Sequence, residues 1–377
     1  MSKWEGEEER DLEKQLKILN KAPVMSYQIE GHDIVDCINI SKQPAFDHPL
    51  LKNYKLQMKP SSLPKEVTKI GDSMPSMTKR HKSITCPRGA IPIRRTSKRD
   101  LIAAKALLYQ YRRNTFPSTS KSPGYHFAIA KTVQDSSQQY HGAKADINTR
   151  SVKVLDSQFS EAFISIQNQF NGIHYGWAVN PQLYGDNLTR TFSSWTADAF
   201  ERTGCFNSLC PGFVQISQKH YMGEALKISK YGASPQYVLD RLIFKDPKTG
   251  NWWIVGNLRS KQKSFIEYWP KSIFTTMADF ASEIQFGGDV YSPISEPAPP
   301  MGSGDFNDNF KRTCYISRIR LVDSSNALFE PENISIQAFT DKPSCYQVSL
   351  KDMLCCLGDL EAQLVMLNEV KVLLGHE

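Results

Sequence analysis

The 377-residue sequence lacks several features that would assign it to a common class of protein. It has no apolar run of 18 or more residues, so we expect no membrane-spanning helix. It also has no P-loop, no dinucleotide-binding glycine fingerprint, no His-Glu-x-x-His zinc motif and no Gly-x-Ser-x-Gly turn. No known motif therefore points to a nucleotide-dependent enzyme, a zinc peptidase or an α/β-hydrolase.

The sequence also lacks histidines and cysteines at the spacing that is typical of metal sites. The eight histidines are scattered without a pair at ligand spacing, and no close pair of cysteines has histidines nearby. A Ser/His/Asp triad remains open from sequence, but nothing points to one. We expect no metal and no cofactor.

The composition is ordinary for a globular protein. Hydrophobic residues make up 40% and charged residues 23%, and the length suits two domains. The formal net charge is +7, and basic residues gather in 79–99. That cluster is open to two interpretations, a nucleic-acid contact or a solvated or partner-facing surface. Because no nucleic-acid-binding motif accompanies it, we favour the surface and expect no nucleic-acid partner.

The cysteines suggest disulfides. Cys205 and Cys210 enclose a short Phe-Asn-Ser-Leu loop that suits a local bridge, and Cys37 and Cys86 bracket a segment that a bridge could close. Such bridges would indicate an oxidising compartment. Residues 1–20 are acidic and do not resemble a signal peptide, yet we expect a protein of the secretory pathway. Three glycosylation sequons agree with that compartment: Asn39, Asn187 and Asn333.

The first third of the chain is predicted to contain two helices. Leucines at helical spacing predict an amphipathic helix over 7–20, and a long loop-rich stretch follows it. Ser97-x-x-Asp100 has the pattern of a capping box, which predicts a helix over 101–113. Residues 116–124 have a linker composition, so we place a domain boundary there.

From residue 125 onward the pattern becomes that of a β protein. Short segments rich in β-branched and aromatic residues alternate with turn signals, which favours an antiparallel two-sheet β-sandwich. Residues 248–251 predict a hairpin turn, and residues 271–280 a short helix. A run of leucines predicts an amphipathic C-terminal helix over 347–377. Examples of these segments are 126–131, 162–167, 173–179, 190–195, 212–216, 237–244, 252–255 and 315–322.

Aromatic residues are interleaved with glycines throughout this region. On a sheet surface they could form a groove for an extended peptide or a saccharide, whereas the alternative is that they belong to the core and turns. The candidate binding residues are Trp177, Tyr184, Trp195, Trp252, Trp253 and Trp269.

Several motifs occur in a fixed order along the chain. They include Asp-Ile-Val-Asp-Cys at 33–37, Gln-Pro-Ala-Phe-Asp-His-Pro-Leu-Leu at 43–51, Cys-Pro-x-Gly at 86–89 and Ile-Pro-Ile-Arg-Arg at 91–95. With these motifs and the aromatic clusters, the chain resembles the neprosin family of plant glutamic peptidases over about residues 11–346.

The resemblance implies a zymogen that is secreted or vacuolar. Residues 1–115 would be the activation peptide and residues 125–346 the β-sandwich peptidase domain. Members cleave peptides after proline at acid pH with two glutamates and no metal, so the implied partners are proline-containing peptides and the chain's own pro-segment. One carboxylate deprotonates the attacking water and the other protonates the leaving amine.

Both glutamate positions differ in this chain. The Ile-Glu-x-Gly-Trp motif of the family has His174 in place of its glutamate, and the Gly-Gly-Glu motif has Asp289. A histidine with a pKa of about 6.5 is cationic in acid, and a nearby aspartate would raise that pKa further. Three functions stay open: a homologue with weak or no peptidase activity, a peptidase using a His174/Asp289 acid–base pair nearer neutral pH, and a peptide- or carbohydrate-binding sandwich.

Two further departures concern the second half of the chain. Glu267 stands where the family usually has glycine, before Tyr-Trp-Pro. The leucine-rich C-terminus replaces the family's glycine-rich tail, which puts the family disulfide of Cys345 in doubt and leaves Cys355 or Cys356 as substitutes.

Overall fold

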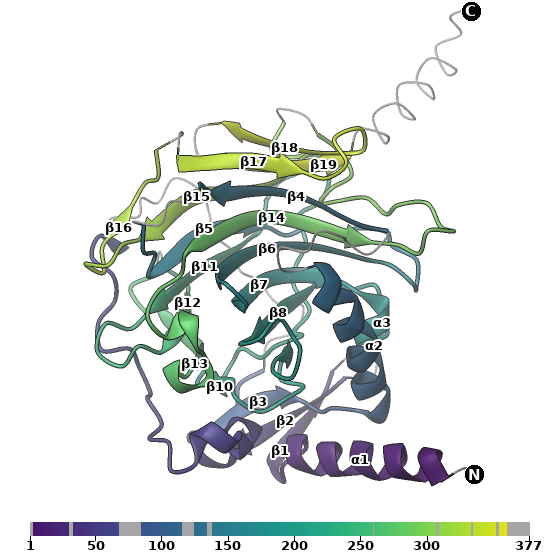
Figure 1. Cartoon of the computed structure of the whole chain (residues 1–377), viewed down its shortest axis with the longest axis vertical. Coiled ribbons are helices and arrows are strands. Elements are labelled where there is room, and N and C mark those ends of the chain that lie inside the picture. Colours follow the sequence, from purple (N-terminus) through teal and green to yellow (C-terminus); the bar gives the residue numbers. More distant parts are fainter. Residues whose placement is uncertain are drawn as a thin grey trace, which may run out of the picture.

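The computed structural model consists of two packed antiparallel sheets and an N-terminal segment (Figure 1). The mainly β sandwich expected from the sequence is confirmed. The structure describes residues 3–29, 33–67, 84–114, 124–133, 138–258, 260–306, 309–332, 335–351 and 354–359.

One sheet has seven strands and carries the two motif positions of the sequence analysis. Its middle strands, β14, β6 and β7, pair over their whole length. In spatial order its strands are β17 (Ile336–Thr340), β4 (Tyr125–Thr132), β14 (Glu283–Tyr291), β6 (Phe159–Asn168), β7 (Asn171–Val179), β8 (Arg190–Thr196) and β9 (Cys205–Phe206).

The other sheet has nine strands. The predicted turn at 248–251 joins two of them as a hairpin, with Gly250 in the left-handed region at φ 75°. In spatial order the strands are β10 (Val214–Gln215), β13 (Ser264–Trp269), β12 (Trp252–Gly256), β11 (Val238–Lys245), β5 (Gly142–Asn148), β15 (Cys314–Val322), β19 (Leu354–Asp359) and β18 (Tyr346–Lys351), and β16 (Leu328–Phe329) pairs with β15.

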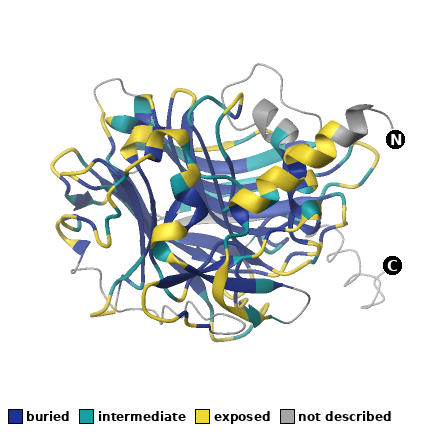
Figure 2. Ribbon diagram, turned by 90° about the horizontal axis from the view of Figure 1, so that it is seen from below, coloured by how far each residue is buried: buried dark blue, intermediate teal, exposed yellow. Residues whose placement is uncertain are grey.

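The main core lies between the two sheets. Side chains alternate between the two faces of a strand, so Ala162, Ile164 and Ile166 of β6 point into this core and their odd-numbered neighbours point to the outer face. β6 is buried along its entire length, which means that the outer face is also covered (Figure 2). That outer face contains the candidate site.

The N-terminal segment has its own small structure. Helix α1 (Lys3–Leu19) and helix α2 (Lys98–Asn114) pack through Leu12, Leu19 and Leu101, which confirms both predicted helices. β1 (Pro23–Gln28), β2 (Ile34–Asn39) and β3 (Ala90–Arg94) form a three-stranded sheet. Short 3-10 turns follow β2: η1 (Ile40–Lys42), η2 (Pro44–Asp47) and η3 (Pro49–Leu51).

The capping box of α2 is present. The Asp100 side chain accepts a hydrogen bond from the Ser97 amide at 2.8 Å, and the Ser97 hydroxyl accepts one from the Asp100 amide at 3.2 Å. This reciprocal pair satisfies two of the amides that the first turn of a helix leaves open. No helix of the described residues is both long enough and apolar enough to cross a bilayer.

The predicted C-terminal helix over 347–377 is wrong where the structure describes it. Instead, β18 and β19 form a hairpin that joins the nine-stranded sheet beside β15. The segment from Tyr346 to Leu350 alternates apolar and polar residues, and Val348 and Leu350 pack on the main core. The two-residue period of a strand therefore overrides the leucine spacing. Residues 352–353 and 360–377 lie outside the described part.

One smaller prediction also needs correction. The short helix expected over 271–280 is a pair of 3-10 turns, η5 (Lys271–Ile273) and η6 (Thr276–Ala278). The sandwich also contains strands outside the segments named from the sequence, among them β5, β13 and β14, in which glycines and charged residues interrupt the apolar pattern.

The disulfides Cys37–Cys86 and Cys205–Cys210 are both present. Cys345 is buried, and its sulfur lies 3.8 Å from the Ser344 hydroxyl oxygen. Among the sequons, Asn39 and Asn187 are exposed, and Asn333 lies outside the described residues.

Candidate functional site

The two motif positions lie on the outer face of the seven-stranded sheet. His174 is on β7 and Asp289 is on β14, and β6 runs between those strands. One nitrogen of His174 and one carboxylate oxygen of Asp289 lie within 4.8 Å of each other. The fold thus brings together two residues that are 115 positions apart in the sequence.

A third ionisable side chain completes the group. Glu161 of β6 is directly opposite Asp289 in the strand register, and its Oε2 lies 3.7 Å from His174 Nε2. All three ligand atoms lie within 4.8 Å of one another, and the residues are 0%, 5% and 1% exposed in the order Glu161, His174, Asp289. We call these three residues the buried triad.

Sequence reasoning missed Glu161. The available signal was a lone glutamate inside the apolar segment 159–166, a place where a charged residue is rarely tolerated without a function or a partner. Its alternation with Ala162 and Ile164 puts it on the outer face, away from the main core.

Aromatic rings surround the buried triad. The Phe163 ring lies against the His174 ring with 3.7 Å between centroids, and Phe192 meets the imidazole edge-on at 6.1 Å. The Tyr125 hydroxyl donates a hydrogen bond to Asp289 Oδ2. In the described part of the chain, neither ring nitrogen of His174 has a hydrogen-bond partner.

Burial sets the protonation of the imidazole. It lowers the pKa of His174 to about 3, because the cationic form would lose its solvation. The expectation that Asp289 raises this pKa is therefore wrong for the closed structure. Burial raises the pKa of the Tyr125 phenol well above its usual value, and the charges of Asp289 and Glu161 raise it further, so the phenol stays a donor.

Glycines flank the buried triad on the same face. Gly176 is two residues after His174, and Gly287 is two residues before Asp289. A Cβ on Gly176 would lie 1.9 Å from the Ala162 carbonyl oxygen, so the backbone of β6 occupies that space. The glycines of both motifs thus allow the strands to approach closely beside the site.

The N-terminal segment contributes to the cover over this face. Ala104 and Leu107 of α2 join an apolar cluster with Tyr125 and Phe192, and α3 (Pro181–Tyr184) supplies further members. Figure 1 shows α2 and α3 together beside β7 and β8. Because the cover includes the predicted pro-segment, the site is closed in the full chain.

Polar contacts hold the N-terminal segment to the sandwich. Arg190 Nη1 lies 2.6 Å from Asp33 Oδ2, and Asp33 Oδ1 pairs with Arg94 at 2.7 Å. The Gln43 side chain donates to the Gln215 carbonyl at 3.1 Å and accepts from the Gln215 amide at 2.8 Å. Arg94 is thereby engaged in an ion pair inside the fold.

The six aromatic binding candidates are all buried, from 0% to 4% exposed. Trp177 and Trp252 lie in the main core and donate their indole N–H to backbone carbonyls. Trp253 lies on the outer face of the nine-stranded sheet, within the apolar cluster that residues 40–63 help to cover. The exposed aromatic platform that a carbohydrate-binding surface requires is therefore not present among these residues in the full chain.

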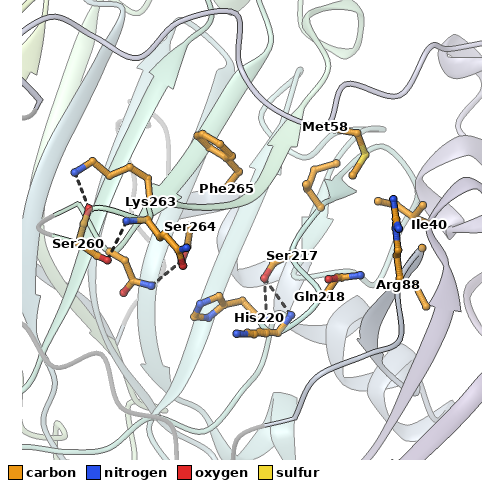
Figure 3. Close-up of a pocket in the computed structure, with 16 residues that line it drawn as sticks. Ile40, Met58, Arg88, Ser217, Gln218, His220, Ser260, Lys263, Ser264 and Phe265 are labelled. Carbon is orange, nitrogen blue, oxygen red and sulfur yellow. Dashed lines mark hydrogen bonds between the residues drawn. The ribbon is translucent and has the colours of Figure 1, made fainter.

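A separate cavity of about 810 Å³ lies between the N-terminal segment and the edge of the nine-stranded sheet (Figure 3). Arg88, Lys219 and Lys263 give it a basic lining, and Lys263 Nζ donates to the carbonyl of Ser260 at 3.0 Å. No member of the buried triad lines this cavity.

Family models match most of the chain. The neprosin model matches residues 156–354, and the neprosin activation peptide model matches residues 26–141. The chain belongs to the neprosin family. The buried triad lies inside the matched neprosin region, and α2 lies inside the matched activation peptide.

Solved structures of glutamic peptidases are also similar. Scytalido-glutamic peptidase with a peptide-based transition state analogue is 10% identical with a TM-score of 0.37, covering 63% of this chain and 98% of that one. SCP-B, a member of the eqolisin family of peptidases in a complex with the tripeptide Ala-Ile-His, is 11% identical with a TM-score of 0.35, covering 63% and 98%.

Proposed function

We propose that this neprosin-family protein binds peptides on the outer face of its seven-stranded sheet and has weak or no peptidase activity in acid. Its natural ligands would be proline-containing peptides, in a secreted or vacuolar compartment. Residues 1–115 would be a pro-segment that covers the face until the linker at 116–124 is cut.

One observation carries this proposal. The two positions that the family uses for glutamates meet on one face, but one of them is an imidazole. The family's reaction needs two carboxyl groups at those positions that exchange acid and base roles. Glu161 restores a second carboxylate nearby, yet it comes from β6, at a different place on the sheet. A displacement of about 1 Å at a reacting centre can lower the rate by about 100-fold.

A second candidate function rests on the short distance between His174 and Asp289. His174 and Asp289 are close enough for an acid–base pair, because their ligand atoms lie within 4.8 Å. Once the cover is removed, Asp289 could orient a neutral imidazole that activates water near neutral pH.

The test is cleavage of a quenched proline-containing peptide by the protein after its linker has been cut, across acid to neutral pH. Asp289→Ala is the site control, and Asp279→Asn, which changes an exposed aspartate, is the matched surface control. We expect peptide binding by fluorescence anisotropy with no cleavage above that of Asp289→Ala in acid.

Cleavage in acid that is lost in Asp289→Ala and kept in Asp279→Asn would overturn the first function. Cleavage confined to near-neutral pH and lost in both Asp289→Ala and His174→Gln would establish the second. Absence of both binding and cleavage would refute both functions.

A further inference from the structure

We infer that the buried triad, Glu161, His174 and Asp289, is a binding site for a divalent first-row transition metal ion, with Zn²⁺ as its simplest occupant. The site would be formed by three strands of one sheet, and neither peptide binding nor proteolysis is needed for it.

The donor set is the first reason. One imidazole nitrogen and two carboxylate oxygens form a mixed N/O set that suits Zn²⁺, Mn²⁺ or Fe²⁺, whereas Ca²⁺ and Mg²⁺ prefer oxygen ligands alone. Two carboxylates and a neutral imidazole carry two negative charges, which a divalent ion would neutralise. Charge neutralisation matters here because all three residues are at most 5% exposed.

The geometry is the second reason. The ligand atoms lie within 4.8 Å of one another, and His174 Nε2 and Glu161 Oε2 are 3.7 Å apart. Zinc–ligand bonds of about 2.0–2.2 Å in a tetrahedron place ligand atoms about 3.4 Å apart. The three ligands come from adjacent strands of one sheet, and rotation of the two carboxylates would supply that contraction.

His174 supplies an independent observation. It is 95% buried, its Nε2 faces Glu161, and neither of its ring nitrogens has a hydrogen-bond partner in the described part of the chain. Buried polar groups are normally satisfied, so an imidazole in this condition needs an explanation. A metal bond to Nε2 gives that nitrogen a partner.

Tyr125 supplies the outer shell. Its hydroxyl donates to Asp289 Oδ2, which fixes the orientation of the carboxylate. Partners of this kind usually change metal affinity by about 10–100-fold. Tyr125 is thus a positioning residue, since it acts through Asp289.

The experiment measures metal bound to the full chain, with its disulfides kept, after refolding with Zn²⁺ and desalting. Refolding gives the ion access to a site that is closed in the folded chain. We expect about one Zn²⁺ per chain by mass spectrometry of the metal content, and about none in Glu161→Gln, His174→Gln or Asp289→Asn. His141→Gln, which removes a histidine outside the triad, is the matched control and should keep the ion.

Two further measurements separate ligation from misfolding and from thiol binding. Tyr125→Phe keeps the ring and all three ligands and should weaken Zn²⁺ binding by about 10–100-fold in a competition titration. Co²⁺ in place of Zn²⁺ should give d–d absorption bands without a sulfur-to-cobalt charge-transfer band, because the triad has no thiolate.

Stoichiometric metal that persists in the triad variants would place the ion outside the triad, and a sulfur-to-cobalt band would place it on the cysteines; either result would overturn the inference. So would a wild-type chain that refolds, by circular dichroism, without retaining metal. All three outcomes are independent of whether the protein cleaves peptides, so failure here leaves the proposed function to its own test.

Discussion

Glu267 is a carboxylic acid in a place that does not favour its charge. It is fully buried on β13, opposite Ile254 and Gln215, where the family usually has glycine. Burial raises its pKa well above the usual value, the Arg241 guanidinium opposes this rise, and Glu224 adds to it. The folded protein therefore holds a proton on Glu267 at pH values where the unfolded chain has lost it.

This shift predicts a pH dependence of stability. Between the unfolded pKa of about 4.5 and the raised folded pKa, the folded state binds more protons, so the free energy of unfolding falls as pH rises. Glu267→Gln removes this loss and should stabilise the protein at neutral and mildly alkaline pH by at least about 1 kcal/mol. Urea unfolding in mildly acidic and mildly alkaline buffer measures the effect.

The exposed Glu332→Gln serves as the control and should keep the wild-type pH dependence. If Glu267→Gln and wild type lose stability in parallel as pH rises, Glu267 is ionised in the fold and this account of it is wrong.

Helix α2 is predicted by a sequence motif and also forms part of the cover over the buried triad. Its start is fixed by the Ser97–Asp100 capping box, and its Ala104 and Leu107 join the apolar cover. A loss of helix stability at its N-terminus should therefore loosen the cover over the buried triad.

Ser97→Ala tests this link. The substitution removes the hydroxyl that accepts from the Asp100 amide, and loss of such a cap lowers stability by about 0.5–2 kcal/mol. Hydrogen exchange should speed up in the first turns of α2 and at the amides of β7 around His174. Ser151→Ala at an exposed position is the control. Faster exchange in α2 with none in β7 would show that α2 does not control access to the site.

At the scale of the whole molecule, no disulfide of the described residues joins the N-terminal segment to the sandwich. One disulfide lies entirely before residue 115 and the other entirely after residue 124. A cut in the linker would therefore leave the N-terminal segment held by packing and by ion pairs such as Asp33 with Arg190. Burial alone would raise the pKa of Asp33, but Arg190 and Arg94 outweigh it and lower the pKa below 3.8.

A lowered carboxylate pKa stabilises the contact above about pH 4, and this stabilisation is lost as pH falls through the folded pKa. Protein cut at the linker should therefore stay together at neutral pH on size exclusion and separate in strong acid. Asp33→Asn should weaken the association at neutral pH by about 1–3 kcal/mol, because it leaves Arg190 and Arg94 without this charge. Equal association of the two proteins at neutral pH would exclude this role for Asp33.

Local patterns determined much of this architecture. Leucine spacing, the capping box, strand-length apolar segments and the hairpin turn depend on near neighbours, so the two N-terminal helices, several strands of the sandwich and both disulfides followed from the sequence. The ordered motifs also identified the family and the two positions, His174 and Asp289, that the fold brings together.

Only the tertiary structure decided the rest, because those features depend on contacts between distant residues. Glu161 joins the site because β6 pairs with β14, and the sequence around a lone glutamate does not show which strand will lie beside it. The first part of the predicted C-terminal helix could not be assigned from its leucines alone, since β18 and β19 form there by pairing with each other and with the distant β15. The tryptophans are buried, and the pKa of His174 is low, because the two sheets pack on each other and the N-terminal segment packs on the sandwich.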